Sequence, residues 1–180
     1  PTPTITPTPL PGSVTLTLAL TQQGLTDTSA TTPVNRNRSV AVVLQGADEQ
    51  IITKTGTVNY SNGTFNGTVN LGPLPSGSYK LKVKLGNFLR SPIGTLVISG
   101  TAASAQATAV AGLTDQFNDN LDALSFYSNG LRKCFGSSLG IKKCDKPEDV
   151  DLNGDGNVDG FDHSIYIKGI RDLSQGLSVL

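Results

Sequence analysis

The sequence predicts a mainly β protein: an antiparallel β-sandwich followed by a small helical module. Two observations lead to this fold class. Between residues 13 and 110 the chain is rich in Val, Ile and Thr, alternates apolar with polar side chains, and carries turn signals roughly every ten residues. From Gly112 onward Thr and Val become scarce, acidic loops appear, and apolar residues recur at helical spacing.

Seven segments of the first part are predicted strands. The opening one, "SVTLTLAL" at 13–20, alternates with a period of two, which is typical of a half-buried strand. The others are also rich in Val, Ile and Thr and lie at 39–45, 51–60, 64–71, 78–85, 94–99 and 105–110. Asn62-Gly63 is a strong signal for a tight hairpin, and "GPLPSGS" at 72–78 predicts another turn. Short strands joined by such turns favour an antiparallel sandwich.

Two segments of the second part place apolar residues on one face at helical spacing. In "LDALSFYSNGLRKCF" (121–135) these residues are Leu121, Leu124, Tyr127 or Ser128, and Leu131. In "GFDHSIYIKGIRDL" (160–173) they are Phe161, Ile165, Lys168 or Gly169, and Leu173. We therefore expect two amphipathic helices in this module.

The sequence divides into four parts: a tract at 1–12, the sandwich at 13–111, the helical module at 112–174 and a tail at 175–180. The tract, "PTPTITPTPLPG", is too rich in Pro and Thr to build a core and prefers an extended polyproline II conformation. Tracts of this composition commonly tether modules of secreted proteins and carry O-linked glycans. We therefore expect a tether that can bear glycans.

Charge and hydropathy argue against two classes of partner. The 14 basic and 14 acidic side chains cancel, so no overall field draws the protein toward nucleic acid or anionic lipid. No apolar run approaches the roughly 20 residues that cross a bilayer. We expect neither nucleic-acid binding nor membrane insertion.

The two cysteines, Cys134 and Cys144, flank the short segment "FGSSLGIKK". A pair at this spacing fits a small disulfide loop formed in an oxidising compartment. The alternatives are two free thiols or half of a metal site, but no further Cys completes a zinc set and the single His163 is distant in the sequence. We predict the disulfide.

The stretch "DLNGDGNVDGFD" at 151–162 crowds oxygen-bearing side chains onto a short segment. Its spacing matches the calcium-loop signature, with Asp in place of the usual Glu at the twelfth position. Ca²⁺ is a hard cation that takes about six to eight oxygen ligands, and it would neutralise the mutual repulsion of these carboxylates. The predicted ligands are Asp151, Asn153, Asp155, Asn157, Asp159 and Asp162.

The later loop positions differ in their expected roles. Asn157 offers its backbone carbonyl, Asp159 acts through a water, and Asp162 closes the shell from the following helix. Gly156 permits a sharp bend that a side chain would obstruct, and Val158 is expected to point into the core. The alternative is a solvated acidic loop or an Asx-rich turn that binds no metal.

A calcium loop followed at once by a helix, with no clear helix before it, resembles the dockerin module, in which two such units pair. A first unit lies at 115–131, but it has lost one residue and lacks ligands at the third and twelfth positions. The resemblance therefore implies at most a weak, hydrated second site. Its candidate ligands are Asp115, Asn118, Asp119 and Asp122.

In dockerins the tenth and eleventh loop residues help to choose the cohesin partner. These positions are occupied by Ala123 and Leu124 in the first unit and by Gly160 and Phe161 in the second. They are more apolar than the Ser/Thr pairs of the cellulosomal type, and Lys168 is a further contact candidate. The preceding sandwich, with its "LPSGSYKLKV" strand entry, resembles the immunoglobulin-like modules that precede dockerins in bacterial surface proteins.

Catalytic chemistry finds little support in the sequence. The single His163 follows directly after Asp162, and the acidic residues gather in loops. We expect no enzyme activity. A carbohydrate-binding sandwich is an alternative, but the chain has no Trp, and the sandwich offers only Tyr60, Phe65, Tyr79 and Phe88 for stacking on a sugar.

These observations predict a non-catalytic extracellular bacterial protein that works by protein association, with Ca²⁺ as its cofactor. Two modes fit: docking onto a cohesin-like partner, or association with copies of itself in a surface fibre. The fibre is the preferred hypothesis, in which a neighbouring subunit accepts the N-terminal tract as an added strand. Ile5, the tract's most apolar internal side chain, would then be buried in that neighbour.

Overall fold

The computed structural model describes residues 12–22, 24–25, 32–86, 88, 91–109 and 126–174. Strands occur at all seven predicted places, with ends that differ from the prediction by a few residues. They are β1 (Ser13–Gln22), β2 (Asn37–Gln45), β3 (Ile51–Ser61), β4 (Thr64–Pro73), β5 (Gly77–Leu85), β6 (Ser91–Ile98) and β7 (Ala102–Ala109).

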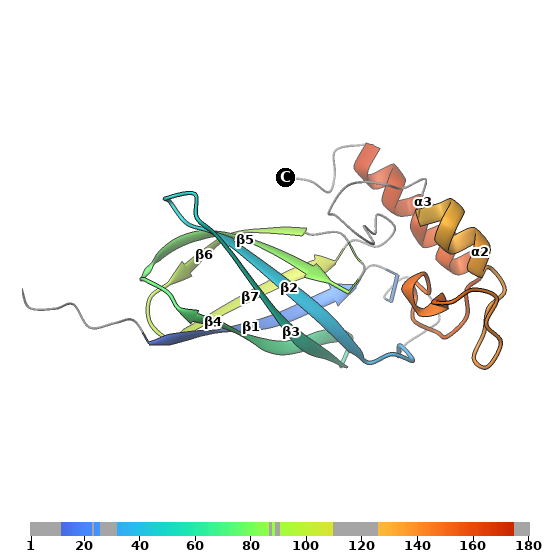
Figure 1. Ribbon diagram of the computed structural model, residues 1–180, viewed down its shortest axis with the longest axis horizontal. Helices are drawn as coiled ribbons and strands as arrows, with labels where there is room; N and C mark the ends of the chain where they lie inside the picture. The colour runs from blue at the N-terminus through green and yellow to red at the C-terminus, as the bar shows by residue number, and fades with distance from the viewer. Residues whose placement is uncertain are drawn as a thin grey trace, which may run out of the picture.

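The strands form one sheet in the order β6-β5-β2-β3-β4-β1-β7, and this sheet folds over on itself. The fold occurs between β3 and β4, which pair only from Val58–Ser61 to Thr64–Gly67. Beyond that corner β3 continues along β2, while β4 continues along β1. The result is two facing layers, β6-β5-β2-β3 and β4-β1-β7 (Figure 1). The edge strands β6 and β7 are in contact on the side opposite the corner between β3 and β4. The predicted β-sandwich is confirmed.

The prediction of a wholly antiparallel sheet is wrong at one pair. β7 runs parallel to β1, with Ala102–Ala109 opposite Thr15–Gln22. Each strand reverses the direction of the strand before it in the chain, so the first and seventh strands point the same way. Because the fold places these two strands side by side, their pairing is parallel.

The core lies between the two layers and follows the predicted alternation. Every second residue of β1 is buried, and β2 and β5 supply matching rows from the facing layer. These inward residues include Val14, Leu16, Leu18 and Leu20 on β1, Val40, Val42 and Leu44 on β2, and Leu81, Val83 and Leu85 on β5. Burying one such side chain stabilises the fold by about 1.5–3 kcal/mol, so these rows account for why the strands pack.

The hairpin between β3 and β4 has the geometry that its sequence predicted. Asn62 and Gly63 have φ angles of 52° and 85°. A two-residue turn of this kind requires positive φ at both positions, which Asn and Gly tolerate best. The turn before β5 is held differently, because Tyr79 Oη donates a hydrogen bond to Pro75 O at 2.9 Å.

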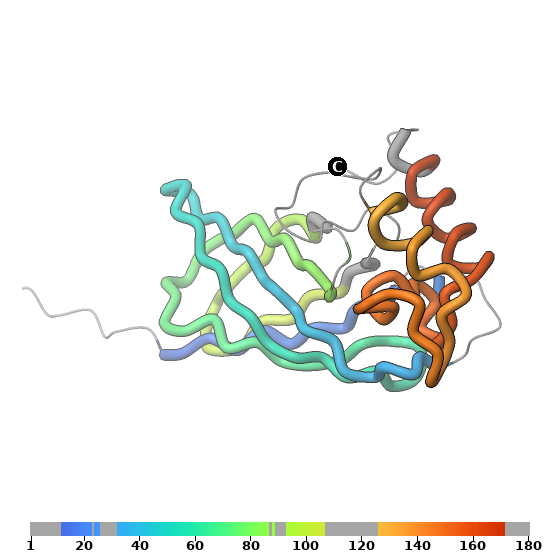
Figure 2. The backbone as a smooth tube through the Cα atoms, turned by 45° about the vertical axis from the view of Figure 1, so that its right-hand side comes forward, coloured from blue at the N-terminus to red at the C-terminus, as the bar shows by residue number. Residues whose placement is uncertain are grey.

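The C-terminal segments pack at the end of the sandwich where β1 ends and β2 begins (Figures 1 and 2). They are η1, a single π-helical turn (Phe126–Leu131), the short helix α2 (Arg132–Cys134), the 3-10 turn η2 (Pro147–Asp149) and the helix α3 (Gly160–Ser174). Ring stacking joins η1 to α3: Tyr166 lies 5.6 Å from Phe126 and 5.8 Å from Tyr127, measured between ring centroids. His163 lies 5.8 Å from Tyr127 between ring centroids, so it packs between η1 and α3.

The first predicted helix, 121–135, is described from residue 126 onward, where the π-helical turn η1 leads into α2, and its start lies outside the described residues. The second predicted helix needs correction. In the second, Phe161 was placed on the apolar face with Ile165, yet its side chain is 54% exposed. The buried face contains Asp162, Ile165 and Tyr166 instead. The carboxylate of Asp162 must face the preceding loop, and this sets the rotation of the helix and turns Phe161 outward.

Candidate metal centre

The candidate calcium loop, residues 151–162, joins η2 to α3 at the end of the sandwich. Two of its glycines have left-handed backbone angles, with φ of 74° at Gly154 and 87° at Gly156. A Cβ added at Gly156 would also lie 2.8 Å from a side-chain carbon of Leu139. Backbone angle and space therefore both require glycine at the sixth loop position, where the sequence predicted a sharp bend.

Asp162 connects the end of the loop to its beginning. Its Oδ1 accepts hydrogen bonds from Leu152 N at 2.7 Å and Asn153 N at 3.2 Å, and its Oδ2 accepts one from Asp159 N at 2.8 Å. The residue is fully buried although it carries a carboxyl group. The third residue of α3 thus holds both ends of the loop together, at the helix end where negative charge is favoured.

The carboxylate of Asp151 shapes the middle of the loop. Its Oδ1 accepts a hydrogen bond from Gly154 N at 2.7 Å, and its Oδ2 accepts one from Gly156 N at 2.8 Å. Asn153 Oδ1 accepts from Asp155 N at 3.0 Å in the same manner. Side-chain oxygens at the first and third loop positions therefore turn the backbone inward toward one point.

The remaining predicted ligands complete this pattern. Asp155 Oδ1 accepts hydrogen bonds from Asn157 N at 2.8 Å and Asn157 Nδ2 at 3.1 Å. Asp159 Oδ1 accepts from Phe161 N at 2.8 Å, which caps the start of α3. The six predicted ligands thus lie in one loop, and side-chain oxygens of five of them accept hydrogen bonds from its backbone amides.

The donor set of the loop consists of carboxyl and amide oxygens, which are the kind of ligand that Ca²⁺ takes. Within the described ranges, no three acidic, His or Cys side chains converge closely enough to hold a metal ion as they stand. Asp151 is nevertheless near enough to Asp155 that the charge of Asp155 raises its pKa, and the charge of Asp151 likewise raises the pKa of Asp162. Clustered carboxyl and amide oxygens with glycine bends are the chemistry that Ca²⁺ requires. In kind and in position along the loop, the residues present fit this ion.

Burial makes the two end carboxylates unfavourable as charged groups. The pKa of Asp162 is raised to about 7 and that of Asp151 to about 6, in both cases mainly because burial disfavours the ionised form. Hydrogen bonds from loop amides oppose this effect. A cation among these oxygens would relieve the cost of their charge.

The disulfide segment, residues 134–144, packs against the loop. Val158 N donates to Ser137 O at 2.8 Å, and Gly136 N donates to Val158 O at 2.7 Å. The side chain of Val158 is also buried, as predicted for an inward anchor. The eighth loop residue is therefore fixed by its backbone as well as by its side chain.

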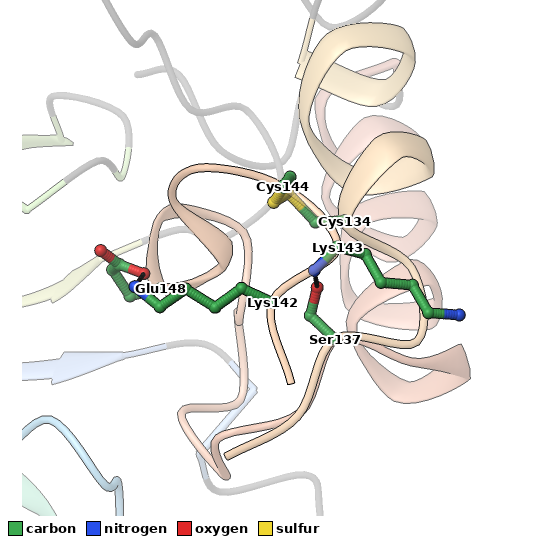
Figure 3. Close-up of a disulfide and its surroundings, with 6 residues drawn as sticks. All are labelled: Cys134, Ser137, Lys142, Lys143, Cys144 and Glu148. Atoms are coloured by element: carbon green, nitrogen blue, oxygen red, sulfur yellow. Dashed lines mark hydrogen bonds and ion pairs between the residues drawn. A yellow bond between two sulfur atoms is a disulfide. The ribbon is translucent and has the colours of Figure 1, made fainter. Parts of the chain in front are cut away.

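Cys134 and Cys144 form the predicted disulfide, with their Cα atoms 5.0 Å apart (Figure 3). The bond joins the end of α2 to the segment that leads into the calcium loop. Inside this closed segment Ser137 Oγ accepts a hydrogen bond from Lys143 N at 3.0 Å. An exposed ion pair of 3.9 Å between Lys142 and Glu148 lies beside it. The disulfide therefore closes the segment that contains Gly136 and Ser137, the two residues that bond to Val158.

The sandwich also contacts the loop, and the sequence did not predict this contact. Gln22 Nε2, at the end of β1, donates a hydrogen bond to Leu152 O at 2.8 Å. Val34 N, just before β2, donates to Gly154 O at 2.6 Å. One signal was present in the sequence: Gln22 is a polar residue at an inward position of a strand that is otherwise apolar on that face.

Arg38, near the start of β2, brings a positive charge to the same junction. Burial lowers the pKa of its guanidinium, while the negative charges of Asp151 and Asp149 act in the opposite direction. Arg38 and Asp151 also line a cavity of about 160 Å³, together with Leu139 of the disulfide segment. The sandwich and the disulfide segment therefore meet next to Asp151, the first predicted ligand.

The other candidate residues fall into two groups. Gly160 and Phe161 are exposed at the start of α3, and Lys168 is partly buried farther along it. Seven candidates lie outside the described residues, namely Ile5, Asp115, Asn118, Asp119, Asp122, Ala123 and Leu124. The N-terminal tract and the first, degenerate loop therefore stay predictions.

The aromatic residues considered for sugar binding belong to the core. Phe65, Tyr79 and Phe88 are buried, and Tyr60 packs edge-on against Phe65 at 5.2 Å between centroids. Sugar stacking needs an aromatic face open to solvent. These four side chains do not provide such a platform.

No protein-family model matches the sequence, and no curated protein matches it significantly. Two solved structures are similar to the chain in fold. They are a C-terminal and an N-terminal interface mutant of a type II cohesin-X-dockerin complex from Acetivibrio cellulolyticus. Each match has a TM-score of 0.57 and 20% sequence identity, and covers 87% of this chain and 94% of the other. The chain is therefore similar in fold to a chain of these cohesin-X-dockerin complexes.

None of the helices in the described part of the chain combines the length and the apolar character that a membrane span needs.

Proposed function

We propose that this chain is a non-catalytic, extracellular association protein, in which a calcium-stabilised, dockerin-like module docks onto a cohesin-like partner. The observation that carries the proposal is the 151–162 loop. Six oxygen-bearing residues at calcium-loop spacing are tied by Asp162 to the helix that would face the partner. In this proposal Ca²⁺ supplies the positive charge that keeps the loop and the start of α3 in register.

The fold comparison supports the association part of the proposal. The match to a chain of the cohesin-X-dockerin complexes extends over 87% of this sequence. In the proposed arrangement the sandwich precedes the dockerin-like module in the chain, as an immunoglobulin-like module would. An extracellular site agrees with the disulfide, which persists in oxidising compartments.

The exposed face of α3 is the proposed docking surface. It carries Phe161, 54% exposed, and Ile167, 49% exposed, with the exposed Gly160 beside them. Partly apolar helix faces of this kind commonly supply the anchors of protein interfaces. Two of these residues, Gly160 and Phe161, occupy the loop positions that select the partner in dockerins.

Self-assembly into a fibre is retained as the second hypothesis. It depends on the N-terminal tract, which lies outside the described residues, so no contact in the structure favours it over cohesin docking. Docking onto a cohesin-like partner is therefore the preferred proposal.

The test of the proposed function measures Ca²⁺ binding and partner binding on the same protein. Calorimetric titration with Ca²⁺ should show one tight site, and binding to an immobilised type II cohesin should disappear in chelator. Replacing Asp162 with Asn should weaken Ca²⁺ binding on the order of ten-fold or more, because the loop loses a charged ligand. Asp145→Asn removes an exposed charge of the same module outside the loop and should change neither result.

The docking surface is tested by Phe161→Ser. This variant should bind Ca²⁺ as the unaltered chain does but lose affinity for the cohesin. Val97→Ser removes an apolar side chain of similar exposure, 64%, from the sandwich and is the matched control. A cohesin that binds equally well in chelator, or equally well to the Phe161 variant, would contradict the proposed mode.

A further inference from the structure

We propose that the sandwich is part of the calcium site's framework, and that Gln22 at the end of β1 is a positioning residue for the loop. This inference rests on the proposed calcium function. Gln22 would not touch the ion. It would act through the backbone carbonyl of Leu152, the second loop residue. In this way it would raise the fraction of metal-free protein whose loop is in the conformation that binds Ca²⁺.

The contact forms a continuous chain from the sandwich to the closing ligand. Gln22 Nε2 donates to Leu152 O at 2.8 Å, and Leu152 N donates to Asp162 Oδ1 at 2.7 Å. Gln22 and Leu152 are each 1% exposed and Asp162 is fully buried, so water does not compete for these groups. The two bonds join residues 22, 152 and 162, which belong to separate elements of the fold.

The side chain is poorly suited to a role in the sandwich core alone. Gln22 occupies the last inward position of β1, after Leu16, Leu18 and Leu20. Its Oε1 is buried and accepts no hydrogen bond within the described part of the chain. A buried amide with an unsatisfied oxygen destabilises a core in which Leu or Met would fit. The hydrogen bond to the loop is the interaction in the structure that favours Gln at this position.

Other contacts from the sandwich side fix the same region. Val34 N donates to Gly154 O at 2.6 Å, and a Cβ built on Gly154 would lie 2.7 Å from Pro33 Cβ. Gly24 packs so closely on Ile165 of α3 that an added Cβ would lie 2.6 Å from it. The sandwich therefore meets the loop at its second and fourth positions and also meets the helix that follows.

These contacts bear on Ca²⁺ affinity through the metal-free state. Without the ion, the charges of Asp151, Asp155 and Asp162 repel one another and favour an open loop. Bonds to the sandwich are made only when the loop is closed, so they raise the fraction of protein that is ready to bind. Apparent affinity is proportional to that fraction. Losing one buried hydrogen bond should therefore weaken Ca²⁺ binding by about five-fold.

The test uses the full chain and the substitution Gln22→Met, which keeps the length and removes the donor. Ca²⁺ affinity is measured by calorimetry, and melting is followed with Ca²⁺ and with chelator. We expect about five-fold weaker binding and a smaller gain in melting temperature on adding Ca²⁺. The control is Val42→Ala, which weakens the sandwich core away from the loop. It should lower both melting temperatures and leave the affinity unchanged.

A second measurement needs no variant. Hydrogen exchange at Val34 N, which donates to Gly154 O, should slow when Ca²⁺ is added to the unaltered chain. An unchanged exchange rate at Val34, or a Gln22→Met protein that melts lower in both conditions with unaltered affinity, would overturn the inference while leaving calcium binding intact. An unaltered chain that does not bind Ca²⁺ would overturn the proposed function as well.

Discussion

At the scale of single residues, Arg38 presents an apparent contradiction. It brings a positive charge to a loop that we propose holds a divalent cation, and it interacts electrostatically with Asp151 and Asp149. The charge stabilises the loop when no metal is bound, because it offsets part of the carboxylate repulsion. It opposes Ca²⁺ for the same reason. Arg38 and Gln22 are therefore expected to act on Ca²⁺ affinity in opposite directions.

The first prediction concerns Arg38→Met, which keeps the aliphatic stem and removes the charge. Ca²⁺ should bind roughly two- to ten-fold more tightly, the range expected for a partly screened charge at short range. The same variant should melt at a lower temperature in chelator. Arg36→Met, at an exposed position two residues earlier, should change neither value. Weaker Ca²⁺ binding by the Arg38 variant would show that its contacts with the loop outweigh its charge.

The second prediction concerns pH. In the metal-free protein the pKa of Asp162 is raised from 3.8 to about 7, so the folded state binds protons more tightly than the unfolded state. The stability of the metal-free protein should therefore fall as pH rises from about 4 to about 7. Ca²⁺ affinity should rise over the same range, because binding requires the ionised carboxylates. Melting in chelator and Ca²⁺ titration at several pH values measure these opposite trends. Parallel trends would contradict the assignment of Asp162 as a ligand.

At the scale of elements, the candidate calcium loop is held by three neighbours. Helix α3 closes it through Asp162, the disulfide segment pairs with Val158, and the sandwich bonds to Leu152 and Gly154. Bonds to these neighbours add to the hydrogen bonds that the loop makes within itself. Each neighbour therefore contributes to order in the metal-free state, and removal of any one should weaken Ca²⁺ binding.

The third prediction follows for the disulfide segment. Replacing Cys134 and Cys144 with Ser should lower the free energy of unfolding by about 2–3 kcal/mol in the chain-entropy model. Ca²⁺ binding should also weaken, because Gly136 and Ser137 would no longer be held against Val158. Denaturant unfolding and calorimetry measure the two effects. Reductant should reproduce them in the unaltered chain and have no effect on the double-Ser variant. Free thiols in the purified protein would contradict the bond.

At the scale of the whole molecule, the two modes of association make different demands on the chain. Docking through α3 uses one end of the molecule and leaves the tract as a tether. Fibre assembly requires the tract to enter a neighbouring subunit. Its prolines lack amide donors, so an added strand could pair only through the remaining residues, with Ile5 as the side chain to bury.

The fourth prediction separates these modes by deleting residues 1–11. If the protein docks onto a cohesin, the deletion should leave partner binding, Ca²⁺ affinity and melting unchanged. If it builds a fibre, filaments formed by the unaltered chain should disappear while the fold is kept. Electron microscopy and cohesin binding of both proteins are the measurements. Filaments that persist without the tract would contradict the strand-addition hypothesis.

Much of the architecture could be predicted because its signals are local. Period-two alternation indicated the first strand, richness in Val, Ile and Thr indicated the other six, and Asn62-Gly63 indicated the tight hairpin. The two cysteines, ten positions apart, indicated their own bond. The pattern from 151 to 162 indicated a loop with a sharp bend at Gly156, which has a φ angle of 87°. In each case the residues that determine the geometry are close in the chain, so their order alone constrains the backbone.

Only the tertiary structure decided the features that depend on contacts between distant segments. The parallel pairing of β1 with β7 arose because the folded sheet brings the first and last strands together. The outward position of Phe161 followed from the direction in which Asp162 must point. Gln22 and Leu152 are separated by 130 positions, and no local pattern joins them. A short stretch of sequence specifies periodicity and turns, whereas the packing of two layers and a loop determines which polar groups meet.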